Sequence, residues 1–152
     1  CREYNMIPVL HPHAGTFMEY RDEVDRAMAE LDKDLVGLCV DTGHCVYAGI
    51  NPSELIETYQ DRVEYLHFKD INKSVLEVVT ANNIDFYKAI GDGVFCPLGE
   101  GCVDFSEVKS TLEKIDYQGW ITVEQDVDPA KDNSSLENAK QSLDFINANV
   151  MA

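Results

Sequence analysis

Basic residues, paired cysteines and long hydrophobic runs are scarce or missing in this sequence. Lysine and arginine together number 12 against 28 acidic residues, and the net charge of −16 repels phosphate backbones and anionic lipid surfaces. No apolar run approaches the roughly 18 residues that a membrane-spanning helix needs, and no basic start followed by an apolar stretch predicts a signal peptide. We therefore expect neither nucleic acid nor a membrane as a partner.

The five cysteines form no C-x-x-C pair. An odd number without regular spacing argues against a disulfide framework and against a cysteine zinc site. Free thiols are typical of a reducing compartment, so we expect a cytoplasmic protein.

What is present is enough for one folded domain. The chain has 152 residues, of which 45% are hydrophobic, and its acidic residues are spread over predicted helix surfaces rather than gathered in a disordered tail. The chain begins with Cys1 rather than methionine, so we expect that the natural start is missing or has been removed.

Strand and helix signals alternate along the chain. Apolar runs predict strands, and residues at helical spacing, several with a capping residue in front, predict helices between them. The alternation predicts a parallel sheet with crossover helices, and the pattern alone leaves open a doubly wound sheet or part of a TIM barrel, which needs about 250 residues when complete. The predicted strands cover residues 6–10, 35–40, 63–68 and 120–123, the predicted helices cover residues 19–33, 51–59, 75–80 and 86–90 and begin again after Asp104 and Ser134, and residues 92–101 are predicted as a loop.

Each predicted strand ends near a residue that can bind a metal. The carboxyl ends of parallel strands meet at one face, so His11, Asp41, His67 and Glu124 are expected to lie together. Imidazole and carboxylate ligands suit Mn, Co, Fe or Zn in a site with open positions. The ordinary alternative is that such a histidine is only hydrogen-bonded and that a carboxylate such as Asp70 caps the next helix.

Several strings resemble the xylose-isomerase-like TIM-barrel superfamily, which contains sugar isomerases, epimerases and dehydratases. VDTGH, LHFKD, PLGEGCVDF and GWITVEQD, which begin at residues 40, 66, 97 and 119, carry this resemblance. HPHAGT from residue 11 and FYKAIGDGVFCPLGEG from residue 86 are similar to its inosose dehydratase subgroup in particular.

For the fold, the resemblance implies the C-terminal half of a (β/α)8 barrel. Residues 1–152 would form one domain with strands five to eight, and strands one to four would be absent. Strands five and eight would then lack a neighbour, so we expect a longer native protein or a homo-oligomer that completes the barrel. The uncovered inward layer would include Val9, Leu38, Val40, Leu66 and Ile121.

For the site, the resemblance implies one divalent ion held by Asp41, His67 and Glu124. His11 is the expected fourth ligand, although it stands where the isomerases carry glutamate. His44 is expected to contact substrate and transfer protons, because an unperturbed imidazole shuttles protons near neutral pH. The implied catalytic residues are His44, Glu124 and Lys69, and the implied substrate contacts are His13, His44 and Lys69. Lys69 is equally well interpreted as an oxyanion partner or as a surface lysine.

The implied reaction is a hydro-lyase reaction of carbohydrate metabolism and inositol catabolism. A cyclic keto-polyol would lose water through a metal-held enediolate, with activity requiring the full-length barrel. A sugar isomerase or epimerase shares all but the last step. An inactive half-barrel module is another alternative, and an apurinic-site endonuclease is disfavoured by the acidic charge. The substrate, the native metal and the oligomeric state are left open by the sequence.

Overall fold

The computed structural model describes residues 1–131 and 134–150. A parallel sheet in the order β1-β2-β3-β6 organises the chain. Its strands are β1 (Val9–Leu10), β2 (Gly37–Asp41), β3 (Val63–Phe68) and β6 (Trp120–Val123). The connecting helices are α1 (Arg21–Glu30), α2 (Thr42–Tyr47), α3 (Pro52–Thr58) and α6 (Phe105–Lys114), and α7 (Ser135–Asn149) follows the last strand.

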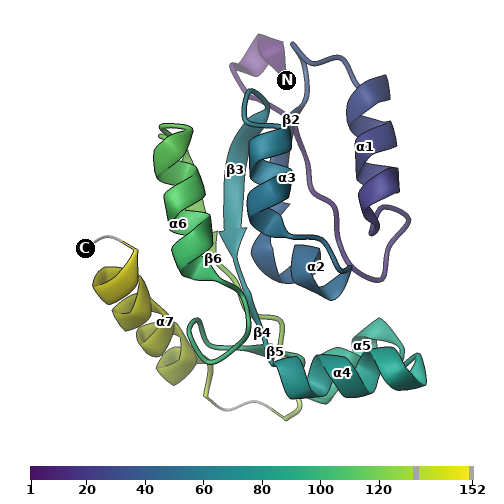
Figure 1. Cartoon of the computed structure of the whole chain (residues 1–152), viewed down its shortest axis with the longest axis vertical. Helices are drawn as coiled ribbons and strands as arrows, with labels where there is room; N and C mark the ends of the chain where they lie inside the picture. Colours follow the sequence, from purple (N-terminus) through teal and green to yellow (C-terminus); the bar gives the residue numbers. More distant parts are fainter. Residues whose placement is uncertain (132–133, 151–152) are drawn as a thin grey trace.

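An excursion separates β3 from α6. It consists of β4 (Asp70–Ile71), α4 (Lys73–Asn82), α5 (Phe86–Gly91) and β5 (Phe95–Cys96), with β4 and β5 paired antiparallel. In Figure 1, β3 points toward β4 and β5, and α4 and α5 extend sideways beyond that end of the sheet. A short 3-10 helix, Arg2–Tyr4, precedes β1.

The predicted elements are present, but the 3-10 helix Arg2–Tyr4 and the strand β4 were not predicted. Three other differences concern the first strand, α2 and the predicted loop. The first strand is shorter than predicted, with two paired residues. The helix α2 was not predicted, because it starts directly at the end of β2 without a linker. The loop predicted over residues 92–101 contains β5, whose ladder of two residues is too short to give an alternating pattern.

Side-chain caps fix where several helices begin. Asn51 accepts from the backbone N–H groups of Ser53 and Glu54 at the start of α3, and Asp104 accepts from Glu107 N at the start of α6. Asn72 caps α4. Asp70, which the sequence offers as a cap, therefore does not cap the helix that follows it.

The residues on each face of the sheet differ from those predicted for the uncovered inward layer. Leu38, Val40 and Leu66 are fully buried in one cluster with residues of α3 and α6, so they face the helices, and their assignment to an uncovered layer was wrong. Ile121 pairs with Leu66 and lies on the same side. When a strand is apolar on both faces, its sequence does not alternate between apolar and polar residues. The face to which each residue points can then not be predicted from the sequence. The opposite face carries Val9, Cys39, Tyr65, His67, Trp120 and Thr122.

β1 and β6 form the two edges of the sheet, and neither has a second partner among the residues that the structure describes. Near these edges lie exposed apolar side chains: Met6, Ile7, Val9 and Trp120, the last 80% exposed. A parallel sheet with open edges agrees with the predicted half of a barrel.

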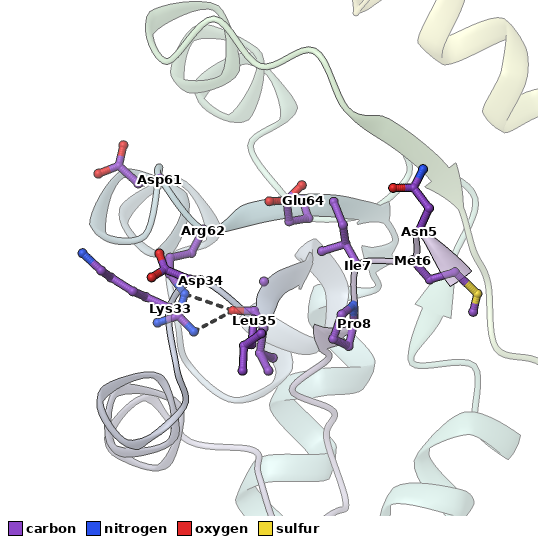
Figure 2. A pocket seen from close by; sticks show the side chains of 12 residues that line it. Asn5, Met6, Ile7, Pro8, Lys33, Asp34, Leu35, Asp61, Arg62 and Glu64 are labelled. Carbon is purple, nitrogen blue, oxygen red and sulfur yellow. Dashed lines mark hydrogen bonds between the residues drawn. The ribbon is translucent and has the colours of Figure 1, made fainter. Parts of the chain in front are cut away.

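A pocket of about 240 Å³ lies at the amino ends of β1, β2 and β3 (Figure 2). Residues such as Pro8, Leu35 and Arg62 line it, and Arg62 donates to the carbonyl oxygen of Val36. This end of the sheet is opposite to the histidines, so the pocket does not coincide with the candidate site. Within the described ranges, no helix has both the length and the apolar character required to cross a bilayer.

Candidate metal centre

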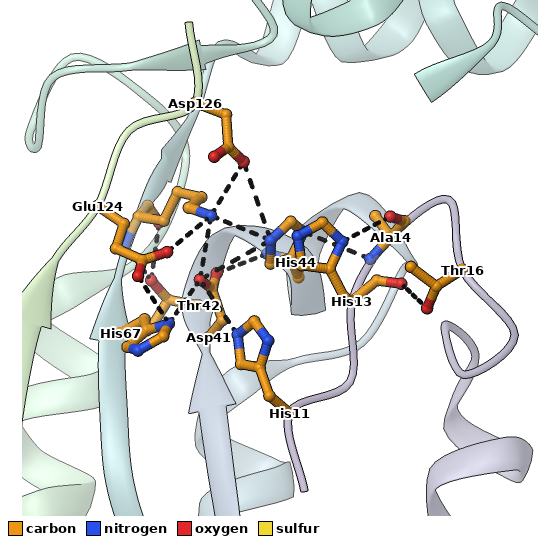
Figure 3. Close-up of polar contacts among 11 residues, drawn as sticks. His11, His13, Ala14, Thr16, Asp41, Thr42, His44, His67, Glu124 and Asp126 are labelled. Carbon is orange, nitrogen blue, oxygen red and sulfur yellow. Dashed lines mark hydrogen bonds and ion pairs between the residues drawn. The ribbon is translucent and has the colours of Figure 1, made fainter. Parts of the chain in front are cut away.

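The carboxyl ends of the parallel strands bring the predicted residues to one place (Figure 3). His11 follows β1, Asp41 ends β2 and His67 lies near the end of β3. Glu124 follows β6, and its N–H continues the ladder by donating to the carbonyl oxygen of Phe68 at 3.0 Å. Strand register, rather than sequence proximity, therefore assembles this group.

The distances within the group are short. Asp41 Oδ2 is 3.5 Å from His67 Nδ1 and 3.8 Å from His11 Nε2, and His67 Nδ1 is 3.4 Å from Glu124 Oε1. Ligand atoms of Asp41, His67 and Glu124 all lie within 4.8 Å of one another.

Three of these atoms are buried without a hydrogen-bond partner among the described residues: His11 Nε2, Asp41 Oδ2 and His67 Nδ1. Buried polar atoms are normally paired, because an unpaired one costs about 1–3 kcal/mol. A divalent cation would pair all of them at once, and imidazole nitrogen and carboxylate oxygen are suitable donors for it. The residues present therefore fit a metal ion.

The two oxygens of Asp41 have different surroundings. Oδ1 accepts from the backbone N–H of His44 at 2.8 Å and so caps α2, while Oδ2 faces the other ligands. Burial by itself raises the pKa of the Asp41 carboxyl, but the adjacent imidazoles of His11 and His67 outweigh burial and hold that pKa well below its usual range. Asp41 is therefore ionised and ready to bind a cation.

Lys69 lies at the centre of the site with 1% of its surface exposed, so its interpretation as a surface lysine was wrong. Its Nζ is 3.3 Å from Asp41 Oδ2, 3.2 Å from Glu124 Oε2 and 3.0 Å from Asp126 Oδ2. Burial lowers the pKa of Lys69, but these carboxylates more than compensate and raise it above its ordinary value.

His44 is buried beside this cation. Lys69 Nζ is 3.0 Å from His44 Nε2, and the ring of His13 lies against the His44 ring with centroids 3.6 Å apart. Burial lowers the pKa of His44 to about 3, with Asp41 opposing the shift and Lys69 adding to it. His44 is therefore neutral at physiological pH and is not the unperturbed imidazole expected from the sequence.

Three further residues of the site were given no role in the predicted site. Asp126 binds Lys69, and its position two residues after Glu124 in an extended segment was the available signal. Thr42 Oγ1 accepts from Lys69 N at 2.9 Å and donates to Lys69 O at 2.7 Å, which ties the start of α2 to the end of β3. A Cβ at Gly43 would lie 2.7 Å from the Lys69 side chain, so only glycine leaves space for that chain. The last two contacts link elements far apart in sequence and gave no local signal.

Comparison with known proteins gives a consistent result. The sequence model of the family described as xylose isomerase-like TIM barrel matches residues 1–149. Two curated proteins named inosose dehydratase, from Geobacillus kaustophilus and Clostridium beijerinckii, are 45% and 41% identical over 130 and 138 residues. These matches cover 86% and 91% of this chain but 42% and 46% of the relatives, so the chain spans about half the length of the curated relatives it matches.

Solved structures share the fold. A probable 3-DHS dehydratase from Bacillus anthracis superposes with a TM-score of 0.72 at 20% identity, over 96% of this chain and 51% of its own. The IolI protein, solved with a zinc atom, has a TM-score of 0.71 at 18% identity, over 97% of this chain and 50% of its own. The predicted family resemblance and the predicted barrel architecture are confirmed.

Proposed function

Because the chain belongs to the xylose isomerase-like TIM-barrel family, we propose that it supplies the metal-binding half of an enzyme that removes water from a cyclic keto-polyol related to inosose. The observation that carries the proposal is a set of three buried ligand atoms at the carboxyl ends of the strands, none of which has a hydrogen-bond partner among the described residues. The names of relatives at 45% and 41% identity support the dehydratase reaction and its place in inositol catabolism.

We assign metal binding to His11, Asp41, His67 and Glu124. A divalent ion such as Mn, Co, Fe or Zn would supply Lewis-acid polarisation of the substrate ketone. The barrel would be completed by an N-terminal half or by a second copy of the chain, and the enzyme is proposed to be cytoplasmic. The domain limits 1–152 remain a prediction.

The reaction requires one proton to leave the carbon beside the ketone and one proton to reach the departing hydroxyl group. Lys69 is positioned to donate to a substrate oxygen, because its ammonium group already lies among carboxylates and His44 Nε2. A substrate oxygen that takes over this hydrogen bond would free the lone pair of His44 Nε2 as a base. Glu124 is the other candidate for proton transfer, and the His13 ring provides a neighbouring substrate contact.

The experiment uses the full-length protein that contains this chain. Wild type, stripped with chelator, is expected to lose turnover of an inosose and to regain it with Mn²⁺ or Co²⁺, with a product lighter by one water. The variant Asp41→Asn keeps the cap of α2 but weakens the ligand, so divalent metal affinity should fall by about tenfold or more in calorimetry. Asp104→Asn, which alters a different capping residue, serves as the matched control.

The outcomes separate the alternatives. Full activity after chelation would contradict the metal assignment, and a product isomeric with its substrate would assign an isomerase or epimerase instead. Metal binding without turnover of any inosose or sugar by the full-length protein would support the inactive module. Cleavage of abasic DNA would assign the endonuclease.

A further inference from the structure

Residues 70–103, the excursion between β3 and α6, build one wall of the site. They have a hydrophobic cluster of their own, which packs against Ala14 near the two histidines of the first loop. From this cluster, the Phe95 ring lies 5.6 Å from the His44 ring at 77°, and Lys69 Nζ lies 5.2 Å from the Phe95 centroid. Phe95 thus lies against His44 and Lys69, two polar residues of the site that are not proposed metal ligands.

The ladder that carries Phe95 is short. Phe95 pairs with Ile71 and Cys96 with Asp70, and β4 and β5 contain two residues each. A ladder of this length is marginal by itself. The apolar cluster packs around the Phe95 side chain, and the backbone beside this short ladder has a further anchor.

Asp70 provides that support. Its carboxylate is 1% exposed, and it accepts four backbone N–H groups: Oδ1 from Ile71 at 2.8 Å and from Val103 at 3.0 Å, and Oδ2 from Gly99 at 2.9 Å and from Gly101 at 3.0 Å. Hydrogen bonds to an ionised acceptor are about twice as strong as neutral ones.

The segment after β5 is shaped around this carboxylate. A Cβ at Gly101 would lie 2.2 Å from Asp70 Oδ1, so a larger residue there would displace the loop. Successive glycine N–H groups of this kind can form a nest for a free anion such as phosphate. Here the N–H groups of Gly99, Gly101 and Val103 are already used by Asp70, so the G-x-G segment serves an internal anion.

We propose that Asp70 is a positioning residue, which holds the β4–β5 ladder so that Phe95 fixes the His44 ring and the Lys69 ammonium group for the reaction. Its effect on turnover rests on the proposed function, while its effect on the position of His44 does not. Asp70 follows Lys69 directly in the chain, so the same four hydrogen bonds also hold the backbone that carries the lysine.

The test compares two variants and a control in the full-length protein. Asp70→Asn keeps the size of the side chain but points an N–H₂ group at N–H donors. Phe95→Leu keeps an apolar side chain but removes the ring from His44 and Lys69. Asp85→Asn is the matched control, because Asp85 caps α5 in the same excursion through one oxygen that asparagine retains.

For Asp70→Asn, amide exchange at Gly99, Gly101 and Val103 should become faster by about tenfold or more. The NMR signals of the His44 ring should shift, and kcat should fall by about tenfold or more, while metal affinity stays within about twofold. Phe95→Leu should shift the ring signals and lower kcat with unchanged exchange. Asp85→Asn should change none of these.

Faster exchange in Asp70→Asn with unmoved His44 signals would overturn the proposal. If Asp70→Asn does not fold, an unchanged kcat in Phe95→Leu would overturn it equally. A wild-type protein that turns over no inosose contradicts the proposed function alone, since the exchange rates and ring signals still test the positioning role.

Discussion

Lys69 is a buried cation surrounded by three carboxylates, two of which belong to proposed catalytic or metal-binding residues. Such a group has two opposite effects on a metal site. It neutralises the carboxylates when no ion is bound, and it repels a divalent ion that approaches the same oxygens. The lysine therefore competes with the metal for Asp41 and Glu124, which lie 3.3 Å and 3.2 Å from its Nζ.

The variant Lys69→Met tests this competition. Loss of the positive charge should tighten Mn²⁺ binding by roughly three- to tenfold, while turnover of the inosose falls because the donor to the substrate oxygen is gone. Calorimetry and steady-state kinetics measure the two effects. Lys114→Met removes an exposed lysine that is 2.9 Å from Glu57 and should change neither. Weaker metal binding in Lys69→Met would instead mean that the lysine organises the ligands.

The helix α2 begins where β2 ends, and Thr42 joins this β2–α2 corner to the end of β3. The hydroxyl group of Thr42 is fully buried and exchanges two hydrogen bonds with the backbone of Lys69. Thr42 therefore ties Asp41 on β2 to Lys69 after β3, in addition to the β2–β3 ladder in which Asp41 pairs with His67.

Replacement of Thr42 by valine should lower the free energy of unfolding by about 1–3 kcal/mol, because the shape is kept while the Lys69 N–H and carbonyl lose their partner. The matched control is Thr58→Val, an exposed threonine whose hydroxyl donates to the carbonyl oxygen of Glu54, and its effect should stay within about 0.5 kcal/mol. Urea denaturation of both variants measures the difference. Equal losses would show that the corner does not depend on this hydroxyl group.

The sequence predicted the elements of the site better than their surroundings. His11, Asp41, His67 and Glu124 could be placed together because topology alone brings parallel strand ends to one edge. The burial of Lys69 and the partners of Asp70 depend on the excursion over residues 70–103, whose short strands have no periodic signature. The face to which each residue of β2 points could not be predicted, because its five residues are all buried and do not alternate between apolar and polar.

Both edges of the parallel sheet lack a further strand among the described residues. Tyr4, Met6, Ile7 and Trp120 are each more than half exposed on or beside the edge elements. Unpaired strand edges bordered by apolar side chains favour association with another chain.

The isolated chain of 152 residues is therefore expected to run above its monomer mass of 17.1 kDa in size-exclusion chromatography with light scattering. Trp120→Lys places a charge on edge strand β6 and should shift the population toward the monomer. Asn149→Lys, an exposed change at the end of α7, is the control for added charge. A stable wild-type monomer would contradict this expectation.

The two oxygens of Asp41 have different partners, and this difference affects which size of ion the site would prefer. Since Oδ1 accepts from the first turn of α2, Oδ2 is the oxygen that faces the other ligands, and this carboxylate would favour offering a cation one oxygen. Ca²⁺ prefers about six to eight oxygen ligands at about 2.3–2.6 Å and often takes both oxygens of a carboxylate. Smaller ions that form bonds of about 2.0–2.2 Å with few ligands match a single fixed oxygen better. The hydrogen bond that caps α2 thus already favours small divalent ions over Ca²⁺ at this site.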